Sequence, residues 1–587
     1  MSYFLMLSKS HGADVLSRFQ QLRVAGRMCD VVLEAGGVEF PAHRALLACS
    51  SDYFWSLFQE HTLESKAWNL SLPALCPAGL EQVLDFIYCS WLSVCPSTLE
   101  DILVAASYLQ VTSATELCSR YMADSLSLNN CCFFANVAAR HGLTEALAAA
   151  DHFIAREMRH LLAPQGDREG LLGLNRDSLQ RVLGAEEMPG VQESALLLLL
   201  LDWLHLNPLP AVHSNLLLSH VRYGLVPPDQ LRGLTTRHPA LRTPFIHSLV
   251  QKALQYHRQG SLQPRLQTEQ TSLRANPGRI LLVGGGARAD RPQTLVQTYE
   301  PQTRKFHALS TRLPARLQQH CVCVLGGFLF VLGGEVVEME EELEKTAVMT
   351  ATGQVWRYDP RFERWEDEEP MIQRRAQFSC CVIDSVIYSI GGRGQRGEAA
   401  LSTVEKYNLP DGCWRKGETL PHAVHGHACA TLGQGVYISG GVHGDQTQSS
   451  KSVFYLDTID GKGWESRASM TVARFGHQAV TVGQMIYSFL GMYEQFCEIE
   501  RYDPTLDQWT RLKPLLNDRF CYGLAATTDG RVLLFGGRKW RDGQEVVTAT
   551  VVEYDTASDT WREVCKMPAP LCGTQCVQLS ILDPTEM

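Results

Sequence analysis

The chain has 587 residues, of which 45% are hydrophobic and 20% charged, and its formal net charge is -10. This composition is typical of globular domains and excludes a disordered or collagen-like chain. The negative charge argues against a nucleic-acid-binding protein, so we expect no nucleic-acid partner. The longest apolar run, residues 195–201, ends at Asp202 and is far too short to cross a bilayer, so we expect no membrane partner.

Cysteine usage indicates a reducing compartment. The chain has 19 cysteines, with no CxxC pair and no Cys/His cluster at zinc spacing. Residues 1–11 have no basic stretch, only a short apolar patch and no small-residue cleavage site, so they do not form a secretory signal. We predict a cytoplasmic, non-secreted protein whose reduced thiols mostly serve as small apolar core residues. A redox-sensing thiol is the alternative.

The first predicted element is a helix over residues 11–22, because apolar residues recur there at helical spacing. These residues are Val15, Leu16, Phe19 and Leu22. A β-rich run follows at 28–33, then a turn at Gly36-Gly37, and then a second run from Val38 that leads into a helix. The order is therefore helix, hairpin, helix.

This order resembles the BTB domain of the Kelch-like protein family. The resemblance implies that Asp30 and His43 join the hairpin to the next helix, with His43 as a buried, hydrogen-bonded side chain rather than a ligand or base. It continues through residues 80–88, 103–109 and 118–121. It also implies a homodimer formed through the first helix, with Val15, Leu16, Phe19 and Leu22 as its dimerisation residues.

The next region is helical and then polar. Residues 128–154 and 192–203 have apolar residues at helical spacing, and a further apolar stretch begins at Val221. These segments resemble the BACK domain that follows BTB in the same family. Residues 257–276 are polar and glutamine-rich without an apolar period, so we predict a linker there.

The C-terminal half repeats. Diglycines that follow apolar β-forming runs recur at steps of 46 to 58 residues, with one degenerate copy at Leu490-Gly491. An aromatic pair follows each diglycine, and its two members are seven residues apart in five units and nine apart in the sixth. The pairs are Tyr299/Phe306, Tyr358/Trp365, Tyr407/Trp414, Tyr455/Trp464, Tyr502/Trp509 and Tyr554/Trp561. Glycine permits a positive φ and a close approach of backbones, and the aromatic rings can fill the space between sheets.

The repeat resembles the Kelch motif and implies a six-bladed β-propeller. The first unit lacks a first strand, and the resemblance implies that a terminal strand at 572–582 completes it and closes the ring. We therefore predict a multidomain chain of three folded domains. They are an α/β BTB domain (1–125), an all-α BACK domain (126–256) and, after a linker (257–277), an all-β six-bladed Kelch propeller (278–587).

No motif for catalysis is present. The chain has no GxSxG, P-loop or HExxH sequence and no GxGxxG between a strand and a helix, so we predict a non-catalytic protein without cofactor or metal. The densest histidine group is His422, His425, His427 and His443. Solvated loop residues are the favoured interpretation, and a metal site is the alternative.

The family resemblance implies that a substrate protein binds one propeller face, through the loops after the diglycines and before the first strand of each blade. Its candidate residues are Arg375, Arg393, Arg474, Arg519, Arg538 and Trp540. Arginines repeated at equivalent blade positions would converge around one pore and suit recognition of carboxylate or phosphate. The alternative is that each arginine pairs within its own blade.

An acidic insertion follows Gly334, and its charge is opposite to that of the predicted arginine face. It contains Glu335, Glu338, Glu340, Glu341, Glu342 and Glu344, with only Lys345 against them. Such a run is usually a solvated loop. The alternative is a flap that competes with acidic partners for the basic face.

The family resemblance implies a substrate-recognition adaptor of a cullin-3 RING ubiquitin ligase, in which BTB and BACK bind cullin-3 and the propeller binds an unidentified protein substrate. The implied cullin-binding residues are Phe54, Phe58, Thr62, Leu63 and Glu64. Family members that bind cullin usually have an apolar residue two positions before the glutamate, where this chain has Thr62. A non-ligase dimeric scaffold, for example one that binds actin or another cytoskeletal element, is therefore the alternative.

Overall fold

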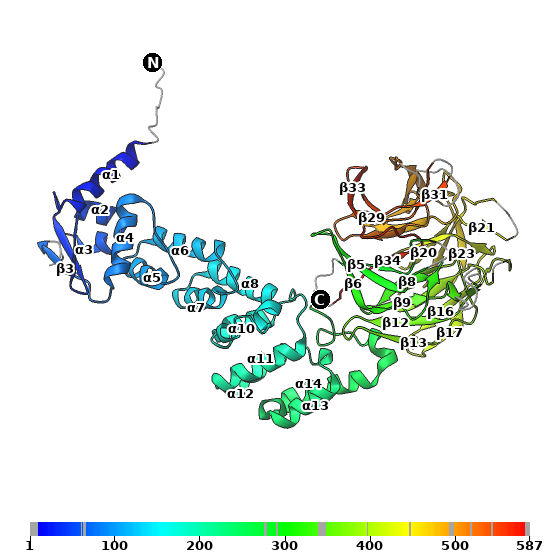
Figure 1. Ribbon diagram of the computed structural model, residues 1–587, viewed down its shortest axis with the longest axis horizontal. Helices are drawn as coiled ribbons and strands as arrows, with labels where there is room; N and C mark the ends of the chain where they lie inside the picture. The colour runs from blue at the N-terminus through cyan, green and yellow to red at the C-terminus, as the bar shows by residue number, and fades with distance from the viewer. Residues whose placement is uncertain are drawn as a thin grey trace, which may run out of the picture. The chain divides into compact units, whose positions relative to one another are not determined.

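The computed structural model describes residues 10–59, 62, 66–274, 279–288, 292–338, 348–395, 397–444, 448–491, 498–516, 519–541 and 544–581. The chain forms two compact units (Figure 1). The first contains residues 1–185 and 202–208, and the second contains residues 186–201 and 209–587. None of the described helices combines the length and the apolar composition that crossing a bilayer requires.

The first unit is an α/β sheet domain followed by helices. Strand β1 (Val31–Ala35) pairs antiparallel with β2 (Val38–Ala42) and parallel with β3 (Asn69–Ser71). The helices are α1 (His11–Val24), α2 (Arg44–Ser50), α3 (Asp52–Leu57), α4 (Pro77–Cys89), α5 (Leu99–Tyr108), α6 (Thr112–Asp124), α7 (Cys131–His141), α8 (Thr144–Leu162), α9 (Arg168–Leu172) and α10 (Arg176–Leu183). The predicted boundary at 125–126 falls between α6 and α7 and stays a prediction.

His43 is the structural residue that the sequence predicts. It is buried, and both its backbone N–H and its Nδ1 lie within hydrogen-bonding distance of the Tyr88 hydroxyl, at 2.8 and 2.9 Å. Its ring also packs edge-on against Phe19 of α1, with 5.2 Å between the ring centroids. His43 therefore ties the hairpin to α4 and α1.

The second unit begins with helices. Helix α11 (Glu193–Leu206) spans the division between the units, and the remaining helical elements belong to the second. These are α12 (Ala211–Ser219), η2 (Tyr223–Leu225), α13 (Pro228–Arg237), η3 (Pro239–Arg242), α14 (Pro244–Arg258) and η4 (Gly260–Arg265).

The segment predicted to be a linker differs from that prediction, because it folds against the propeller. Arg361 donates to the Tyr256 hydroxyl and, over 2.8 Å, to Oε1 of Gln263, while Asp359 pairs with the same guanidinium at 2.5 Å. A Cβ on Gly326 would meet the Pro264 carbonyl, so backbone packs directly on backbone there. Gln263 is thus a hydrogen-bonded partner of a buried arginine, whereas Ser261, Arg265, Thr268 and Glu269 of the same segment are exposed to solvent.

The propeller has six four-stranded sheets within the described residues, which confirms the predicted fold. Blade one is β34 (Gln575–Gln578), β4 (Ile280–Val283), β5 (Leu295–Glu300) and β6 (Lys305–Arg312); blade two is β8 (Cys321–Leu325), β9 (Phe328–Leu332), β12 (Val355–Asp359) and β13 (Arg364–Glu368); blade three is β14 (Ser379–Ile383), β15 (Val386–Ile390), β16 (Val404–Asn408) and β17 (Cys413–Lys416). Blade four is β19 (Ala428–Leu432), β20 (Gly435–Ser439), β22 (Val453–Asp457) and β23 (Trp464–Arg467); blade five is β24 (Gln478–Val482), β25 (Met485–Phe489), β26 (Ile499–Asp503) and β27 (Gln508–Arg511); blade six is β28 (Gly523–Ala526), β29 (Arg531–Phe535), β32 (Thr550–Asp555) and β33 (Thr560–Lys566).

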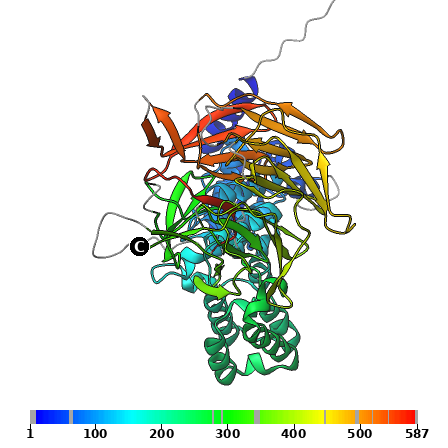
Figure 2. The ribbon, with the colours of Figure 1, turned by 90° about the vertical axis from the view of Figure 1, so that its right-hand side faces the viewer.

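The ring closes through blade one. Strand β34 comes from the C-terminal end of the chain and pairs antiparallel with β4, from Gln575 opposite Val283 to Gln578 opposite Ile280. Figure 2 shows this dark red strand among the green strands that begin the propeller. Strand β34 thus covers the edge that β4 would otherwise expose, and the inner edges that remain are short and face the channel of the ring.

The first glycine of a diglycine makes room for a histidine of the next blade. A Cβ on Gly391 would lie 2.9 Å from Cε1 of His427, and one on Gly440 would lie 2.7 Å from Cε1 of His477. Both glycines also have a positive φ, 56° and 64°. Steric room and backbone conformation therefore both require glycine at these positions.

The aromatic pairs tie neighbouring blades together. Tyr407 lies opposite Trp414 in the register of β16 and β17, with ring centroids 5.2 Å apart, and Trp414 donates its Nε1–H to the Glu369 carbonyl of blade two over 2.8 Å. Trp464, Trp509 and Trp561 make the same bond to the blade before them. In the unit with the longer spacing, Tyr455 lies opposite Glu465 instead of the tryptophan.

Candidate functional site

The two sets of loops predicted to form the binding face lie side by side at one end of the propeller. Residues after the diglycines form antiparallel β-bridges with residues that precede the first strand of a blade. We call this end of the propeller the loop face. The bridges are Glu335 to Gln318, Val442 to His425, Gly286 to Cys572, Arg393 to Ala376 and Arg538 to Phe520. Small accessory strands extend it: β7 (Leu317–Gln318), β10 (Glu335–Glu338), β11 (Val348–Ala351), β18 (Val424–His425), β21 (Val442–His443), β30 (Arg538–Arg541) and β31 (Gln544–Val547).

Two of the predicted binding arginines are buried inside their own blades, which corrects the prediction that they contact substrate. Arg375 pairs with Glu405 at 2.7 Å and donates to the carbonyls of Gly391 and Thr403 at 2.7 and 2.9 Å. Arg474 pairs with Glu500 at 3.3 Å, and neither side chain of this pair is exposed to solvent. Each guanidinium is already occupied by its own blade, as the alternative interpretation expected.

Arg519 is a third buried arginine that cannot contact a substrate. It donates to the carbonyl and the hydroxyl of Thr550, at 3.1 and 2.7 Å, as Arg375 donates to the carbonyl and the hydroxyl of Thr403. Burial lowers the pKa of Arg519 to about 10. All three arginines therefore stabilise the start of a blade, and the predicted basic ring does not form.

The other three predicted residues remain at the loop face. Arg393 pairs with Glu335 at 3.2 Å, and Arg538 pairs with Glu545 at 2.9 Å, both partly exposed. Trp540 is 39% exposed and lies on the β30–β31 hairpin, with its ring 6.4 Å from that of Phe520. An exposed tryptophan beside paired charges can supply apolar contact area to a protein partner.

The acidic insertion begins inside the fold. Glu335 is buried at the start of β10 and holds Arg393, and Gln318 donates to it over 3.0 Å. It is therefore a structural carboxylate rather than part of a solvated loop. The side chain of Glu338 lies outside the described residues, as do Glu340, Glu341, Glu342, Glu344 and Lys345, so the flap stays a prediction.

The histidine group does not converge on one point. His427 is buried, and its Nε2 lies 2.7 Å from the Ser379 hydroxyl, so it differs from the expected solvated loop residue. His422 stacks on His443, with ring centroids 5.6 Å apart. Among the described residues, no group of three or more His, Cys, Asp and Glu is arranged to hold a metal ion.

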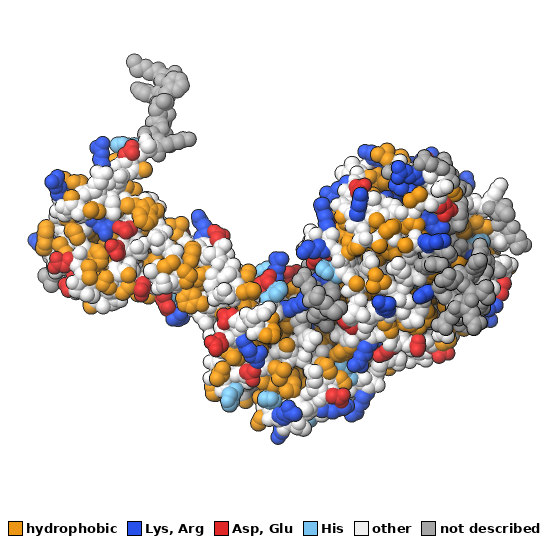
Figure 3. Space-filling view, in the orientation of Figure 1, with side chains coloured by type: hydrophobic (Ala, Val, Ile, Leu, Met, Phe, Trp, Pro, Cys, Tyr) orange, Lys and Arg blue, Asp and Glu red, His pale blue; other side chains and the backbone are white. Residues whose placement is uncertain are grey.

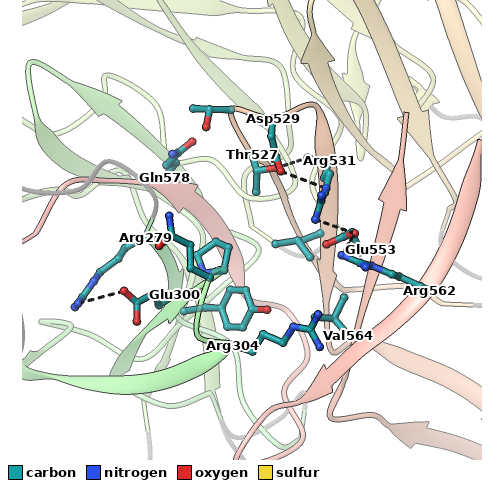
Figure 4. A pocket seen from close by; sticks show the side chains of 15 residues that line it. Arg279, Glu300, Arg304, Thr527, Asp529, Arg531, Glu553, Arg562, Val564 and Gln578 are labelled. Atoms are coloured by element: carbon teal, nitrogen blue, oxygen red, sulfur yellow. Dashed lines mark hydrogen bonds and ion pairs between the residues drawn. The ribbon is translucent and has the colours of Figure 1, made fainter. Parts of the chain in front are cut away.

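A cavity of about 430 Å³ lies at the seam between blades six and one (Figure 4). Its arginines face carboxylates in the pairs Arg531–Asp529, Arg531–Glu553, Arg562–Glu553 and Arg279–Glu300. Figure 3 shows basic side chains, with acidic ones among them, over the region that β29 and β33 occupy in Figure 1. The cavity is lined by turn residues 301–304 and 527–529, which lie at the strand ends opposite the loop face. It is therefore separate from the predicted substrate site.

The predicted cullin-binding residues differ in how deeply they are buried. Phe54 is fully buried in the core of the first unit, so the prediction that it contacts a partner is wrong. Phe58 is partly exposed, stacks on Phe54 at 5.6 Å and lies under the Arg44 guanidinium. The Thr62 hydroxyl bonds within its own loop, 2.5 Å from the Leu57 carbonyl. Leu63 and Glu64 lie outside the described residues.

Helices α3 and α5 also expose aromatic side chains that the sequence analysis did not identify. Trp55, on α3 next to the buried Phe54, is 59% exposed, and Tyr108 at the end of α5 is 40% exposed. Tyr53 of α3 contacts Tyr108, with 5.2 Å between ring centroids. A helical pattern in which position 54 faces the core and position 55 faces solvent would have identified Trp55.

Of the four predicted dimerisation residues, Val15 is the exposed one, and Val24 at the end of the same helix is exposed as well. Val15 is exposed, whereas Phe19 packs against the core of the unit and Leu16 and Leu22 are half-buried. Arg23 anchors the helix through a 3.1 Å ion pair with Asp85 of α4.

Comparison with known proteins identifies all three parts of the chain. Residues 19–126 match the BTB/POZ domain, residues 131–236 match the domain described as BTB And C-terminal Kelch, and residues 280–497 match the Attractin/LZTR1 beta-propeller. Kelch-like protein 34 of Homo sapiens is 43% identical over 630 residues, which cover 99% of this chain and 97% of that protein. Kelch-like protein 36 of Bos taurus is 31% identical over 577 residues, covering 96% and 91%. The chain therefore belongs to the Kelch-like family of BTB–BACK–Kelch proteins.

Proposed function

We propose that this protein is the substrate-recognition adaptor of a cullin-3 RING ubiquitin ligase. BTB and BACK bind the cullin, the BTB domain dimerises, and the loop face of the propeller binds the substrate protein. The domain order and the similarity over 99% of the chain to another Kelch-like protein support this assignment. The adaptor contributes binding and positioning rather than a catalytic group.

The exposed aromatic surface of α3 and α5 is the observation that supports cullin binding most directly. Trp55 and Tyr108 expose large amphipathic rings on two helices that the contact between Tyr53 and Tyr108 joins, and Trp68, Trp91 and Phe133 of the same unit are exposed as well. Exposed tryptophan and tyrosine are the side chains that most often dominate the binding energy of protein interfaces. The surface that binds cullin is thus centred on Trp55 and Phe58 rather than on Phe54.

The substrate site lies on the loop face, with Trp540 and Arg538 on blade six and Arg393 across the ring on blade three. The two guanidinium groups are partly exposed and paired with carboxylates, so an acidic partner can compete for them. Trp540 supplies the apolar contact. We therefore expect a substrate segment that combines an acidic side chain with an apolar one.

A non-ligase scaffold is the second candidate, and Thr62 favours it. Its hydroxyl is hydrogen-bonded within its own loop, so the loop offers no apolar anchor at this position. Loss of one apolar anchor would cost about 1–3 kcal/mol of binding free energy. That cost weakens cullin binding without abolishing it, provided that the aromatic surface takes part.

Replacing Trp55 tests the proposal. In the full chain, we expect W55A to weaken binding to the N-terminal domain of cullin-3 by about tenfold or more, because an interface tryptophan is typically a dominant contact. The measurement is biolayer interferometry with immobilised cullin domain. The matched control is W540A, which removes an exposed tryptophan from the loop face and should leave cullin affinity unchanged. Equal affinities for wild type, W55A and W540A would contradict the proposed surface.

A further inference from the structure

The channel of the propeller collects thiols that the proposed function does not use. A cavity of about 460 Å³ is lined by the innermost strands of the blades and includes Cys321 of β8, Cys380 of β14 and Cys429 of β19. Cys323 lies behind Cys321 on the same strand, and Cys381 lies behind Cys380. Neighbouring blades thus bring five thiols to adjoining strands.

Cys321 and Cys380 face each other across the seam between blades two and three. The Cys321 thiol lies 3.0 Å from the Phe378 carbonyl of blade three, and the Cys380 thiol lies 3.4 Å from the Val322 carbonyl of blade two. Each thiol therefore bonds to backbone within two residues of the other cysteine. Both side chains are partly exposed and line the cavity, so a small solute in the channel can reach them.

The surroundings of Cys380 favour its thiolate. Its contacts with Cys321 and Cys323 lower the pKa of Cys380. Burial and the contact with Cys380 raise the pKa of Cys321, so Cys321 stays a thiol. A thiolate beside a second thiol is the arrangement in which oxidation ends as a disulfide.

We propose that Cys380 and Cys321 form an oxidant-sensitive thiol pair in the propeller channel, which hydrogen peroxide converts into a disulfide joining blades two and three. The Cys380 sulfur attacks one peroxide oxygen, the O–O bond breaks, and Cys380 sulfenic acid and one water form. The Cys321 sulfur then displaces the hydroxyl as a second water. Two thiols lose two electrons and two protons, and the peroxide is reduced to two waters.

The disulfide would join the innermost strands of two blades that other contacts already hold together. Cys321, Cys323 and Cys380 belong to one apolar cluster of blades two and three, so their side chains pack together in the folded propeller. Such a link restricts the unfolded chain and stabilises the propeller. Oxidation therefore stiffens the propeller rather than opening it.

Peptide mapping of the native full chain tests the proposal. The protein is treated with hydrogen peroxide, free thiols are alkylated, and the digest is analysed by mass spectrometry without reduction. We expect a peptide pair linked through Cys321 and Cys380, absent before treatment and lost on reduction with dithiothreitol. C321S and C380S should each lose this pair, whereas C576S, which removes a channel thiol of blade one, should retain it.

The outcome separates three results. The Cys321–Cys380 link with the stated pattern supports the pair. A link from Cys380 to Cys323 or Cys429 instead contradicts it, and so do thiols that remain fully alkylated after peroxide treatment. The peptide map of the wild-type protein alone distinguishes these results, so the test does not depend on the folding of the variants. A rise in melting temperature on oxidation of wild type, lost in C380S, is the second readout.

Discussion

At the residue scale, a buried arginine at the start of a blade is shielded from solvent and forms its hydrogen bonds within that blade. Arg375 is fully buried, and its guanidinium bonds a carboxylate and two backbone carbonyls. Removing one partner of a buried ion pair leaves an uncompensated charge, which costs far more than losing an exposed pair. Arg375 therefore stabilises the fold and does not recognise a ligand.

The Arg375–Glu405 pair yields a stability prediction. E405A leaves the Arg375 guanidinium buried without its carboxylate, so we expect a loss of about 3–5 kcal/mol in the free energy of unfolding of the propeller. E398A removes the exposed partner of neighbouring Arg374 and should cost no more than about 1 kcal/mol. Denaturant unfolding of the full chain and native-state hydrogen exchange of the β14–β17 sheet compare the losses of unfolding free energy in the two variants. Similar losses for the two variants would contradict the structural role.

The sequence predicted which arginines repeat but not where their side chains lie. The partner of Arg375 is Glu405, 30 residues later, and the partner of Arg474 is Glu500, 26 residues later. Such a pairing is a property of the folded blade, and no local pattern shows it. Phe54 is a different case, because the helical pattern of α3 separates the buried Phe54 from the exposed Trp55.

At the element scale, the diglycines, histidines and aromatic pairs together form contacts between neighbouring blades. His320 reaches the Val283 carbonyl of blade one, and His427 and His477 reach serines of blades three and four. The period of glycines and aromatic residues was sufficient to predict six blades. The histidines were missed, because their partners lie in another repeat and only the folded ring brings them together.

These histidines make the stability of the propeller depend on pH. Burial lowers the pKa of His320 to about 4 and that of His427 to about 3, whereas an unfolded histidine has a pKa of about 6.5. The unfolded chain therefore binds more protons, and stability that is complete above pH 6.5 is lost as the pH falls. Each histidine contributes a loss of up to about 1.4 kcal/mol per pH unit.

Thermal unfolding of the full chain between pH 7.5 and 5 measures this dependence. We expect the melting temperature to fall below pH 6.5, and H427Q to fall less steeply, because glutamine can bond Ser379 without titrating. A melting temperature that stays constant through this window, or an H427Q slope equal to that of wild type, would show that the histidines are not linked to folding.

At the scale of the whole molecule, the chain combines a recognition module with an assembly module. Dimerisation through α1 would present two loop faces and raise the effective concentration for a substrate with two binding segments. The domain order followed from sequence motifs alone. The packing of Tyr256 and Gln263 on blade two did not, because their hydrogen bonds to Arg361 join residues about a hundred positions apart.

The central claim is that this protein binds cullin-3 as an adaptor, and calorimetric titration of the full chain with the N-terminal domain of cullin-3 tests it most directly. We predict saturable binding with one cullin domain per chain, and a complex of two chains and two cullin domains by light scattering. No heat of binding with both proteins at tens of micromolar would contradict the adaptor assignment and favour the scaffold.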